Sequence, residues 1–155
     1  MKILLTAVNA KYIHSNPAVY SLQKFTAEYA PEYKKDIELA EFTINHYADD
    51  ILQEIYRRKP DVVAFSCYIW NWKLIREILT ELPKILPNTE IWLGGPEVTY
   101  DGPGLLSEFP QVTGIMVGEG EVTFREVLDQ YVREAESTGQ SEQQPEPDSI
   151  EQQAT

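Results

Sequence analysis

The chain has 155 residues, one cysteine, and 25 acidic against 13 basic side chains, which give a net charge of −12. This length suits one globular domain, and the single Cys67 excludes an internal disulfide, a four-cysteine zinc site and an iron–sulfur cluster held by the chain's own thiolates. The negative charge argues against nucleic-acid and anionic-membrane partners. Because the sequence has neither a signal peptide nor an apolar run of about 20 residues, we expect a cytoplasmic protein.

Short β-rich runs alternate with segments of helical periodicity along the chain. The predicted strands are 2–8, 36–42, 61–66, 90–93 and 113–117. This alternation is typical of a parallel sheet with helices on both faces. The second run alternates polar and apolar residues, whereas the first, third and fourth are nearly continuous in apolar residues, so the second strand should lie at an edge. We therefore predict a three-layer α/β fold with a five-stranded parallel sheet, flavodoxin-like, of strand order 2-1-3-4-5.

Three helices have clear sequence signals. Asp49 and Asp50 open one helix and three basic residues before Pro60 close it, with an apolar face of Ile51, Leu52, Ile55 and Tyr56. A second is expected from 71 to 82, where Pro83 ends or kinks it, and a third from 121 to about 134. Residues 137–155 are rich in Gln, Glu, Ser and Pro. We predict a folded domain over 1–136 and a disordered tail, or the start of an interdomain linker, over 137–155.

In such a sheet, ligands bind beyond the carboxyl ends of the strands. The loop after the first strand ends with Asn16 as a helix cap and Pro17 at the first helical position. His14 in this loop is either bonded to the backbone or a ligand or proton donor near a bound group. The loop after the third strand holds Tyr68, Trp70 and Trp72, whose rings either cover the core or line a cleft. Cys67 is interpreted as a small inert apolar residue.

Two further loops at this edge are rich in glycine. Gly94-Gly95-Pro96-Glu97 follows the fourth strand, and Gly118-Glu119-Gly120-Glu121 follows the fifth. Paired glycines allow the backbone to approach a ligand or the next strand closely. Neither segment is a dinucleotide or nucleoside triphosphate motif, so these ligands are not indicated.

Taken together, residues 1–134 resemble the cobalamin-binding domain at the amino end of many radical S-adenosylmethionine enzymes. The resemblance rests on segments 9–16, 65–71, 93–97 and 118–121. It implies that the cofactor's nucleotide tail inserts between the sheet and the helices, with Ser66 bonding the benzimidazole end and Gly94 and Gly95 leaving room. The expected cofactor-binding residues are Asn9, Tyr12, His14, Ser15, Asn16, Ser66, Cys67, Tyr68, Trp70, Gly94, Gly95, Pro96, Glu97, Gly118, Glu119 and Gly120.

The same resemblance places 118–120 along the far side of the tail, and 12–16 and 68–70 under or beside the corrin ring. It also leads us to expect that Gly95→Trp blocks the tail while leaving the fold intact. The cobalamin motif D-x-H-x-x-G reads here as Tyr12-Ile13-His14-Ser15-Asn16-Pro17 and lacks its Asp and Gly. We therefore favour a base-off cofactor with no protein histidine on cobalt, with ligation by His14 as the alternative.

The cysteine motif of radical S-adenosylmethionine enzymes is absent from this chain, which has Cys67 alone. The resemblance then implies that the iron–sulfur cluster and S-adenosylmethionine are held by a separate radical domain. It also implies that the whole enzyme carries out methyl transfer or a related radical reaction, and we expect a methyltransferase. The chain by itself should bind cofactor and catalyse nothing. Two other classes stay open at this point: a flavin mononucleotide-binding electron carrier, and an interaction module without a cofactor.

Overall fold

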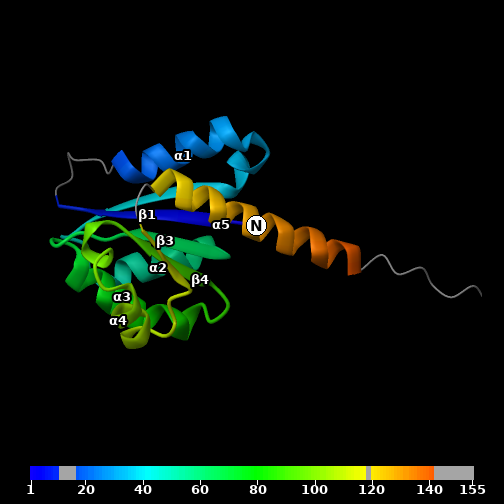
Figure 1. Ribbon diagram of the computed structural model, residues 1–155. Coiled ribbons are helices and arrows are strands. Elements are labelled where there is room, and N and C mark those ends of the chain that lie inside the picture. Colours follow the sequence, from blue (N-terminus) through cyan, green and yellow to red (C-terminus); the bar gives the residue numbers. More distant parts are fainter. Residues whose placement is uncertain (11–16, 118–119, 142–155) are drawn as a thin grey trace, which may run out of the picture. The chain divides into compact units, whose positions relative to one another are not determined.

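The computed structural model describes residues 1–10, 17–117 and 120–141 (Figure 1). Within these residues, five parallel strands form one sheet in the predicted order β2-β1-β3-β4-β5. The strands are β1 (Ile3–Asn9), β2 (Ile37–Thr43), β3 (Val62–Ser66), β4 (Glu90–Gly94) and β5 (Gly114–Met116). The helices are α1 (Pro17–Tyr29), η1 (Pro31–Asp36), α2 (Ala48–Arg58), α3 (Trp72–Ile85), η2 (Pro96–Val98), α4 (Gly102–Glu108) and α5 (Gly120–Ser141).

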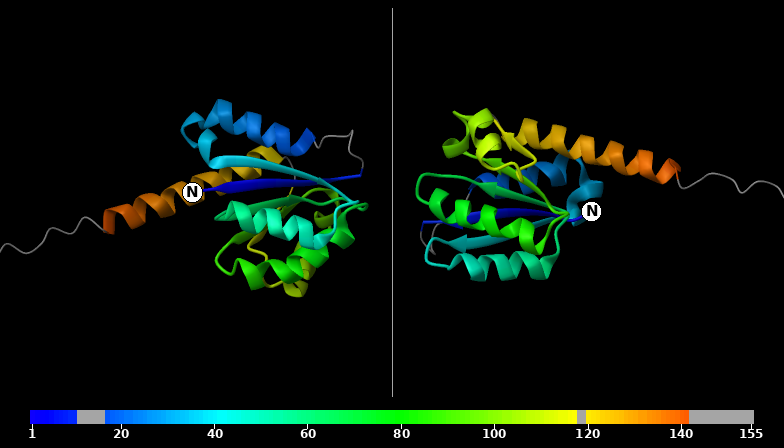
Figure 2. Two further views of the ribbon diagram at one scale, coloured as in Figure 1. Left: turned by 180° about the vertical axis from the view of Figure 1, so that it is seen from behind. Right: turned by 90° about the horizontal axis from the view of Figure 1, so that it is seen from below.

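Helices cover both faces of the sheet, as the three-layer prediction requires. α1 lies on one face, and α2 and α3 lie on the other (Figure 1 and Figure 2). Side chains alternate along each strand, so Leu4 and Val8 of β1 enter the large core beneath α2 and α3, while Leu5 faces α1. Because β1 and β3 are covered on both faces, their residues are almost all buried, which explains their continuous apolar runs.

The edge position of β2 and the course of α2 follow the prediction closely. β2 pairs with β1 alone, from Ile3 opposite Ile37 to Asn9 opposite Thr43. α2 has Asp49 and Asp50 in its first turn and Arg57 and Arg58 in its last, which complement the helix dipole. Ile51, Leu52 and Ile55 are buried, but Tyr56 is half exposed and lies under the Lys59 ammonium. The prediction that Tyr56 belongs to the buried face was therefore wrong.

α3 continues through Pro83 to Ile85, three residues beyond the predicted end. Proline has no N–H, so the carbonyl of Leu79 loses its intrahelical partner. Gln111 replaces that partner, because its Nε2 donates to the Leu79 oxygen at 2.9 Å. The helix can therefore pass the proline without an unsatisfied carbonyl.

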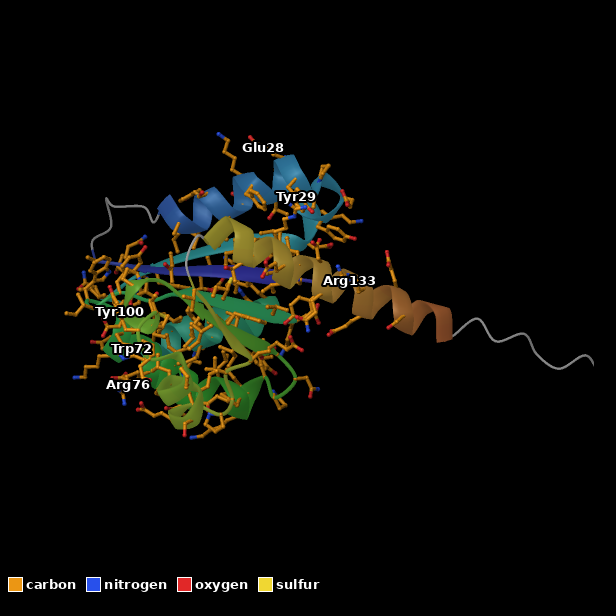
Figure 3. All side chains as sticks on the ribbon, viewed as in Figure 1. Glu28, Tyr29, Trp72, Arg76, Tyr100 and Arg133 are labelled. Atoms are coloured by element: carbon orange, nitrogen blue, oxygen red, sulfur yellow. The ribbon has the colours of Figure 1, made fainter. Side chains whose placement is uncertain are left out.

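The short helix α4 is held against the outer side of α3. Arg76 of α3 pairs with Glu108 of α4, and the Trp72 ring lies edge-on to Phe109 at a centroid distance of 6.1 Å. Figure 3 shows Trp72 and Arg76 projecting together from α3. Asp101 caps the start of α4 by accepting a hydrogen bond from the Gly104 N–H.

α5 ends at Ser141, later than the predicted end near 134. Contacts divide the chain after Phe124 into a unit of Met1–Phe124, which contains the sheet, and a unit that begins at Arg125. The predicted domain boundary at 136 stays a prediction, and 142–155 of the predicted tail lie outside the described residues. No helix in the described part of the chain is long and apolar enough to span a bilayer.

Candidate functional site: a cavity at the carboxyl edge of the sheet

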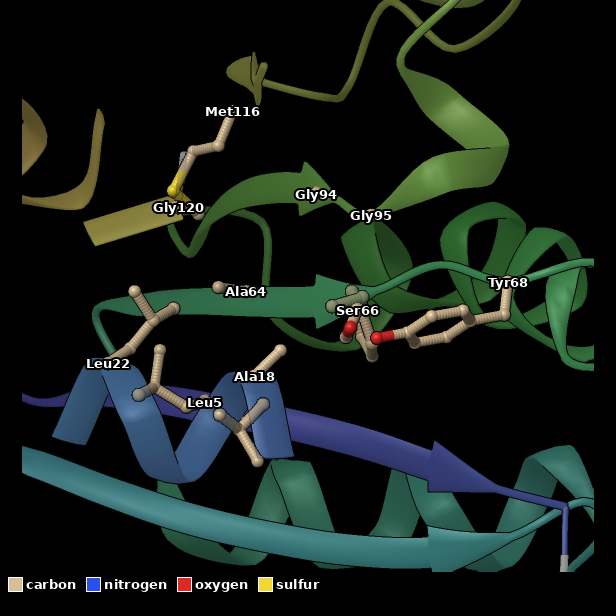
Figure 4. A pocket seen from close by; sticks show the side chains of 12 residues that line it. Leu5, Ala18, Leu22, Ala64, Ser66, Tyr68, Gly94, Gly95, Met116 and Gly120 are labelled. Atoms are coloured by element: carbon tan, nitrogen blue, oxygen red, sulfur yellow. The ribbon is translucent and has the colours of Figure 1, made fainter. Parts of the chain in front are cut away.

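A cavity of about 190 Å³ lies between α1 and the sheet, toward the carboxyl ends of β3 and β4 (Figure 4). Its walls come from four strands, from α1 and from the first residue of α5. The lining residues are Leu5, Ala18, Val19, Leu22, Ala64, Phe65, Ser66, Tyr68, Gly94, Gly95, Met116 and Gly120. The sequence thus predicted the position of a ligand site at this edge, and the structure supplies a hollow there.

The floor of the cavity is made of small residues on neighbouring strands. Ser66 of β3 is in register with Gly94 of β4, and Gly94 is in register with Met116 of β5. Ala64 lies two residues before Ser66 and therefore shares its face of the sheet. A methyl group, a hydroxymethyl group and a hydrogen atom fill little space, so the sheet surface is hollow under α1.

The two adjacent glycines differ in how much space a side chain would have. A Cβ placed on Gly94 would meet nothing closer than Met116, at an ordinary 3.8 Å. Gly95 has a φ of +102°, and a Cβ there would lie 2.5 Å from the carbonyl oxygen of Cys67. Side chains at Gly95 are excluded by the path of the chain itself. The expectation that Gly95→Trp leaves the fold intact was therefore wrong, and Gly94 is the position at which volume can be added to the cavity.

Two hydroxyl groups lie at one end of the cavity. Figure 4 shows the Tyr68 ring reaching from the loop after β3 toward Ser66, which ends that strand. Ser66 and Tyr68 are both partly accessible. A group bound in the cavity therefore meets hydrogen-bonding partners at this end and apolar side chains elsewhere.

Asn71 fixes this loop, and sequence reasoning did not single it out as a site residue. Its side chain is fully buried at the start of α3. Nδ2 donates to the carbonyls of Val8 and Ser66, each at 3.0 Å, and Oδ1 accepts from the Tyr68 N–H at 2.8 Å. One amide thus ties the end of β1 to the end of β3 and orients the turn that carries Tyr68. A polar residue directly before an apolar helix was the only signal in the sequence.

Cys67 contributes its backbone to the site rather than its thiol. The side chain is fully buried in the core beneath α2 and α3, on the face opposite the cavity, and burial raises the pKa of the thiol. This agrees with the interpretation of Cys67 as an inert apolar residue. The backbone N–H donates to the Gly94 carbonyl at 2.7 Å, which joins the loops after β3 and β4.

The loop after β3 carries a pair of stacked aromatic rings, of which Tyr68 lines the cavity. The rings of Tyr68 and Trp70 are stacked, with centroids 4.4 Å apart and planes within 7°. Ile69 and Trp70 are exposed, so this loop presents an apolar surface at the carboxyl edge. Of the two interpretations of the aromatic residues, the structure assigns Tyr68 to the cavity wall, whereas Trp72 packs beside Phe109.

Of the remaining predicted site residues, some lie at the carboxyl edge of the sheet and others fall outside the residues that the structure describes. Asn9 ends β1, with Nδ2 3.5 Å from a Glu41 carboxylate oxygen, while Pro96 and Glu97 are exposed in η2. Gly120 lines the cavity beside Leu22. Tyr12, His14, Ser15, Asn16, Gly118 and Glu119 lie outside the described residues. Among those that are described, no cluster of three or more His, Cys, Asp or Glu side chains could hold a metal ion.

The fold and the cavity define the class of the protein: a doubly wound α/β domain with a cavity at the carboxyl edge of the sheet, the edge at which this class of fold binds ligands. Residues 4–128 match the B12 binding domain family. The match spans most of the chain, so the chain belongs to this family and is a cobalamin-binding domain. The predicted family is thereby confirmed, and the flavin and cofactor-free alternatives gain no support.

The proteins that are similar to the chain include two curated methyltransferases and a solved cobalamin-binding protein. TokK of Streptomyces tokunonensis, a cobalamin-dependent radical SAM methyltransferase, is 37% identical over 86 residues, which are 55% of this chain and 12% of TokK. The 2-(S-pantetheinyl)-carbapenam-3-carboxylate methyltransferase of Streptantibioticus cattleyicolor is 39% identical over 70 residues, 44% of this chain and 10% of that enzyme. The similar part therefore spans about a tenth of these curated relatives.

Among solved structures, the fold is similar to that of a cobalamin-binding protein from Desulfitobacterium hafniense. It matches with a TM-score of 0.56 at 12% identity, over 84% of this chain and 58% of that one. At this identity the likeness shows the fold alone, and it agrees with the flavodoxin-like topology predicted from the sequence.

Proposed function

We propose that the cavity between α1 and the sheet receives the nucleotide tail of cobalamin, and that the chain is the cofactor-binding part of a radical S-adenosylmethionine methyltransferase. The observation that carries the proposal is the small-residue floor of Ala64, Ser66 and Gly94. It leaves about 190 Å³ open at the edge where this fold binds ligands. Two of the segments that carry the family resemblance, 9–16 and 118–121, come in the sequence at the end of β1 and after β5.

The residues present fit the end of such a tail. A buried apolar cavity of about 150 Å³ is enough to bind benzene, so 190 Å³ can take an aromatic ring system while the rest of the tail extends through the mouth. The Ser66 hydroxyl can donate to a ring nitrogen, and the apolar wall residues Leu5, Val19 and Leu22 can contact the ring faces. The stacked Tyr68 and Trp70 rings then lie where a corrin would cover the carboxyl edge.

When bound, cobalamin would supply methyl-group transfer chemistry through its cobalt ion. The part of this chain is to hold the tail and to orient the cofactor with the exposed aromatic loop beneath or beside it. The chain has one cysteine, so the iron–sulfur cluster and S-adenosylmethionine belong to a radical domain outside it. Two observations support this assignment of the cluster to another domain. Both similar proteins are methyltransferases by name, one of them a radical SAM methyltransferase, and the segment that matches this chain is only about a tenth of their length.

The test is binding of hydroxocobalamin to the full chain, measured by the corrin absorbance retained after gel filtration and by titration. We expect binding by the wild type and a loss of roughly tenfold or more, equal to about 1.4 kcal/mol, in Gly94→Leu. The added side chain would fill part of the cavity and has no backbone to displace, so the unliganded variant should unfold at or above the wild-type temperature.

The matched control is Gly102→Leu. This position on α4 takes the same substitution away from the cavity, and a Cβ there would meet only Ile115 at 3.9 Å. It should bind cobalamin as the wild type does. Wild-type affinity in a folded Gly94→Leu protein would show that the tail does not occupy this cavity, and no binding by the wild type would contradict the proposed function as a whole.

A further inference from the structure

We propose that the cavity is a selectivity filter for the lower base of the cofactor, favouring corrinoids whose tail ends in a benzimidazole over those whose tail ends in adenine. The inference rests on the proposed function and concerns which members of the cobamide class the chain accepts. It follows from the uneven distribution of polar groups over the cavity wall.

The described side chains that line the cavity away from its carboxyl end are apolar. They include Leu5 of β1, Val19 and Leu22 of α1, Ala64 of β3 and Met116 of β5, while Ala18 of α1 also lines the cavity but is exposed. Ser66 and Tyr68 provide the polar side-chain atoms, and both lie at the carboxyl end. No charged or amide side chain occurs among the described lining residues.

Main-chain polar groups of the cavity floor also have hydrogen-bond partners within the sheet. Ala64 and Ser66 belong to β3, a strand paired on one side with β1 and on the other with β4. Beyond the end of the β3 ladder, the Gly94 carbonyl accepts from the Cys67 N–H at 2.7 Å. The wall formed by residues 18–22 lies near the start of α1, where the carbonyls accept hydrogen bonds along the helix and the N–H groups of the first turn point toward the carboxyl edge of the sheet. A polar ligand atom placed deep between floor and wall would therefore find few partners.

The two kinds of lower base make opposite demands on such a cavity. In a benzimidazole, one ring nitrogen is bonded to the ribose and the other can accept one hydrogen bond, while the rest of the bicycle is hydrocarbon. Ser66 can satisfy that one acceptor. Adenine carries additional ring nitrogens and an exocyclic amine on the part of the base that would be buried, and burying these groups without partners is unfavourable.

The experiment compares the affinity of the full chain for three complete cobamides and one truncated corrinoid. The complete cobamides end in dimethylbenzimidazole, benzimidazole and adenine, and the truncated one is cobinamide, which has no lower base. We expect the two benzimidazole forms to bind within a few-fold of each other. The adenine form should bind roughly tenfold or more weakly, the effect of leaving a polar group unpaired in a buried site. Cobinamide should also bind more weakly than cobalamin.

The four ligands distinguish a failure of the proposed selectivity from a failure of the proposed function. Equal affinity for the adenine and dimethylbenzimidazole forms would overturn the selectivity while leaving cobalamin binding in place. Equal affinity for cobinamide and cobalamin would overturn it too, since the base would then not enter the cavity. Absence of binding for all four would instead contradict the proposed function.

A wall variant tests the physical cause directly. Leu22 lies on α1 beside Gly120 and is only partly buried, so a polar residue there should be tolerated. Leu22→Gln provides an amide that can pair with adenine and should reduce the preference for the benzimidazole form several-fold. Leu22→Met keeps the wall apolar at similar volume and should preserve the preference. An affinity ratio that is the same in both variants would contradict selection by the apolar wall.

Discussion

At the scale of single residues, Asn71 joins parts of the chain that are far apart in sequence. Its amide bonds to Val8 at the end of β1, to Ser66 at the end of β3 and to the Tyr68 N–H. Asn71→Leu has nearly the same volume but leaves these three groups without their side-chain partner. We expect a loss of about 2–4 kcal/mol in unfolding free energy, measured by urea denaturation. Cobalamin affinity should fall as well, because the loop that carries Tyr68 is no longer oriented.

Asn88→Leu is the matched control for this prediction. Asn88 is exposed in the turn before β4, so the same substitution should change stability by no more than about 0.5 kcal/mol. The prediction fails if Asn71→Leu is as stable as this control. Unchanged cobalamin affinity in a destabilised but folded Asn71→Leu would limit Asn71 to a purely structural role.

The contrast among Asn71, Gly94 and Gly95 shows how far a sequence determines a site residue by residue. The places of Ser66 and Gly94 on the cavity wall were predictable, since small residues at strand ends indicate space at the sheet edge. The role of Gly95 depends on a backbone angle and on the approach of Cys67, which no local pattern encodes. Asn71 depends on a carbonyl 63 positions earlier in the chain. Contacts that arise from the packing of distant segments become visible only in the fold.

At the scale of elements, the helix α2 carries a compact charge cluster that makes a pH-dependent contribution to stability. Hydrogen bonds from Arg57 and Arg58 hold the pKa of Glu54 below its ordinary value of 4.5. A carboxylate with a lowered pKa in the folded state stabilises the fold above its ordinary pKa, and this contribution is lost as the pH falls through the lowered value. Glu54→Gln should therefore lower the urea midpoint slightly at pH 7, and the difference from wild type should shrink below about pH 4.5.

Salt gives an independent check on this cluster, because exposed ion pairs are screened. At pH 7 the effect of Glu54→Gln should be smaller in 1 M than in 0.1 M sodium chloride. Glu77→Gln on α3, an exposed glutamate outside the cluster, serves as the control and should show weaker dependence on both pH and salt. A Glu54→Gln effect that is constant from pH 7 to pH 4 would contradict the assignment.

The strands and helices were easier to predict from the sequence than the roles of single residues, and the reasons are physical. The edge place of β2 was predictable from its alternation, and the burial of β1 and β3 on both faces from their apolar continuity, while the full strand order came from the flavodoxin-like fold that fits these patterns. The continuous apolar run of β4 was less informative, because its residues alternate between buried and partly buried. The end of α3 was not predictable, because Gln111 compensates for Pro83 from a distant loop. Tyr56 was misplaced because its spacing fits the buried face while its ring lies beneath the neighbouring Lys59.

At the scale of the whole molecule, the candidate cavity and the last four acidic residues lie in different parts of the chain. The cavity is lined by residues between Leu5 and Gly120, and the family match ends at residue 128. Residues 142–155 contribute Glu142, Glu146, Asp148 and Glu151, and thus four of the twelve net negative charges. Low apolar content there gives the segment little means of contributing to a buried site. Binding of cobalamin should therefore be a property of the part before residue 142.

Truncation after Ser141 tests this separation. The shortened chain has a net charge of −8, from −12 for the full chain less −4 for the removed residues. We expect its unfolding temperature and its affinity for cobalamin to match those of the full chain within about twofold, measured at 0.15 M salt, where distant charges are screened. A full-length variant with E142Q, E146Q, D148N and E151Q keeps the segment and removes its charge. If truncation weakens binding and this neutral variant does not, the segment itself contributes to the site, whereas a loss in both would assign the effect to its charge.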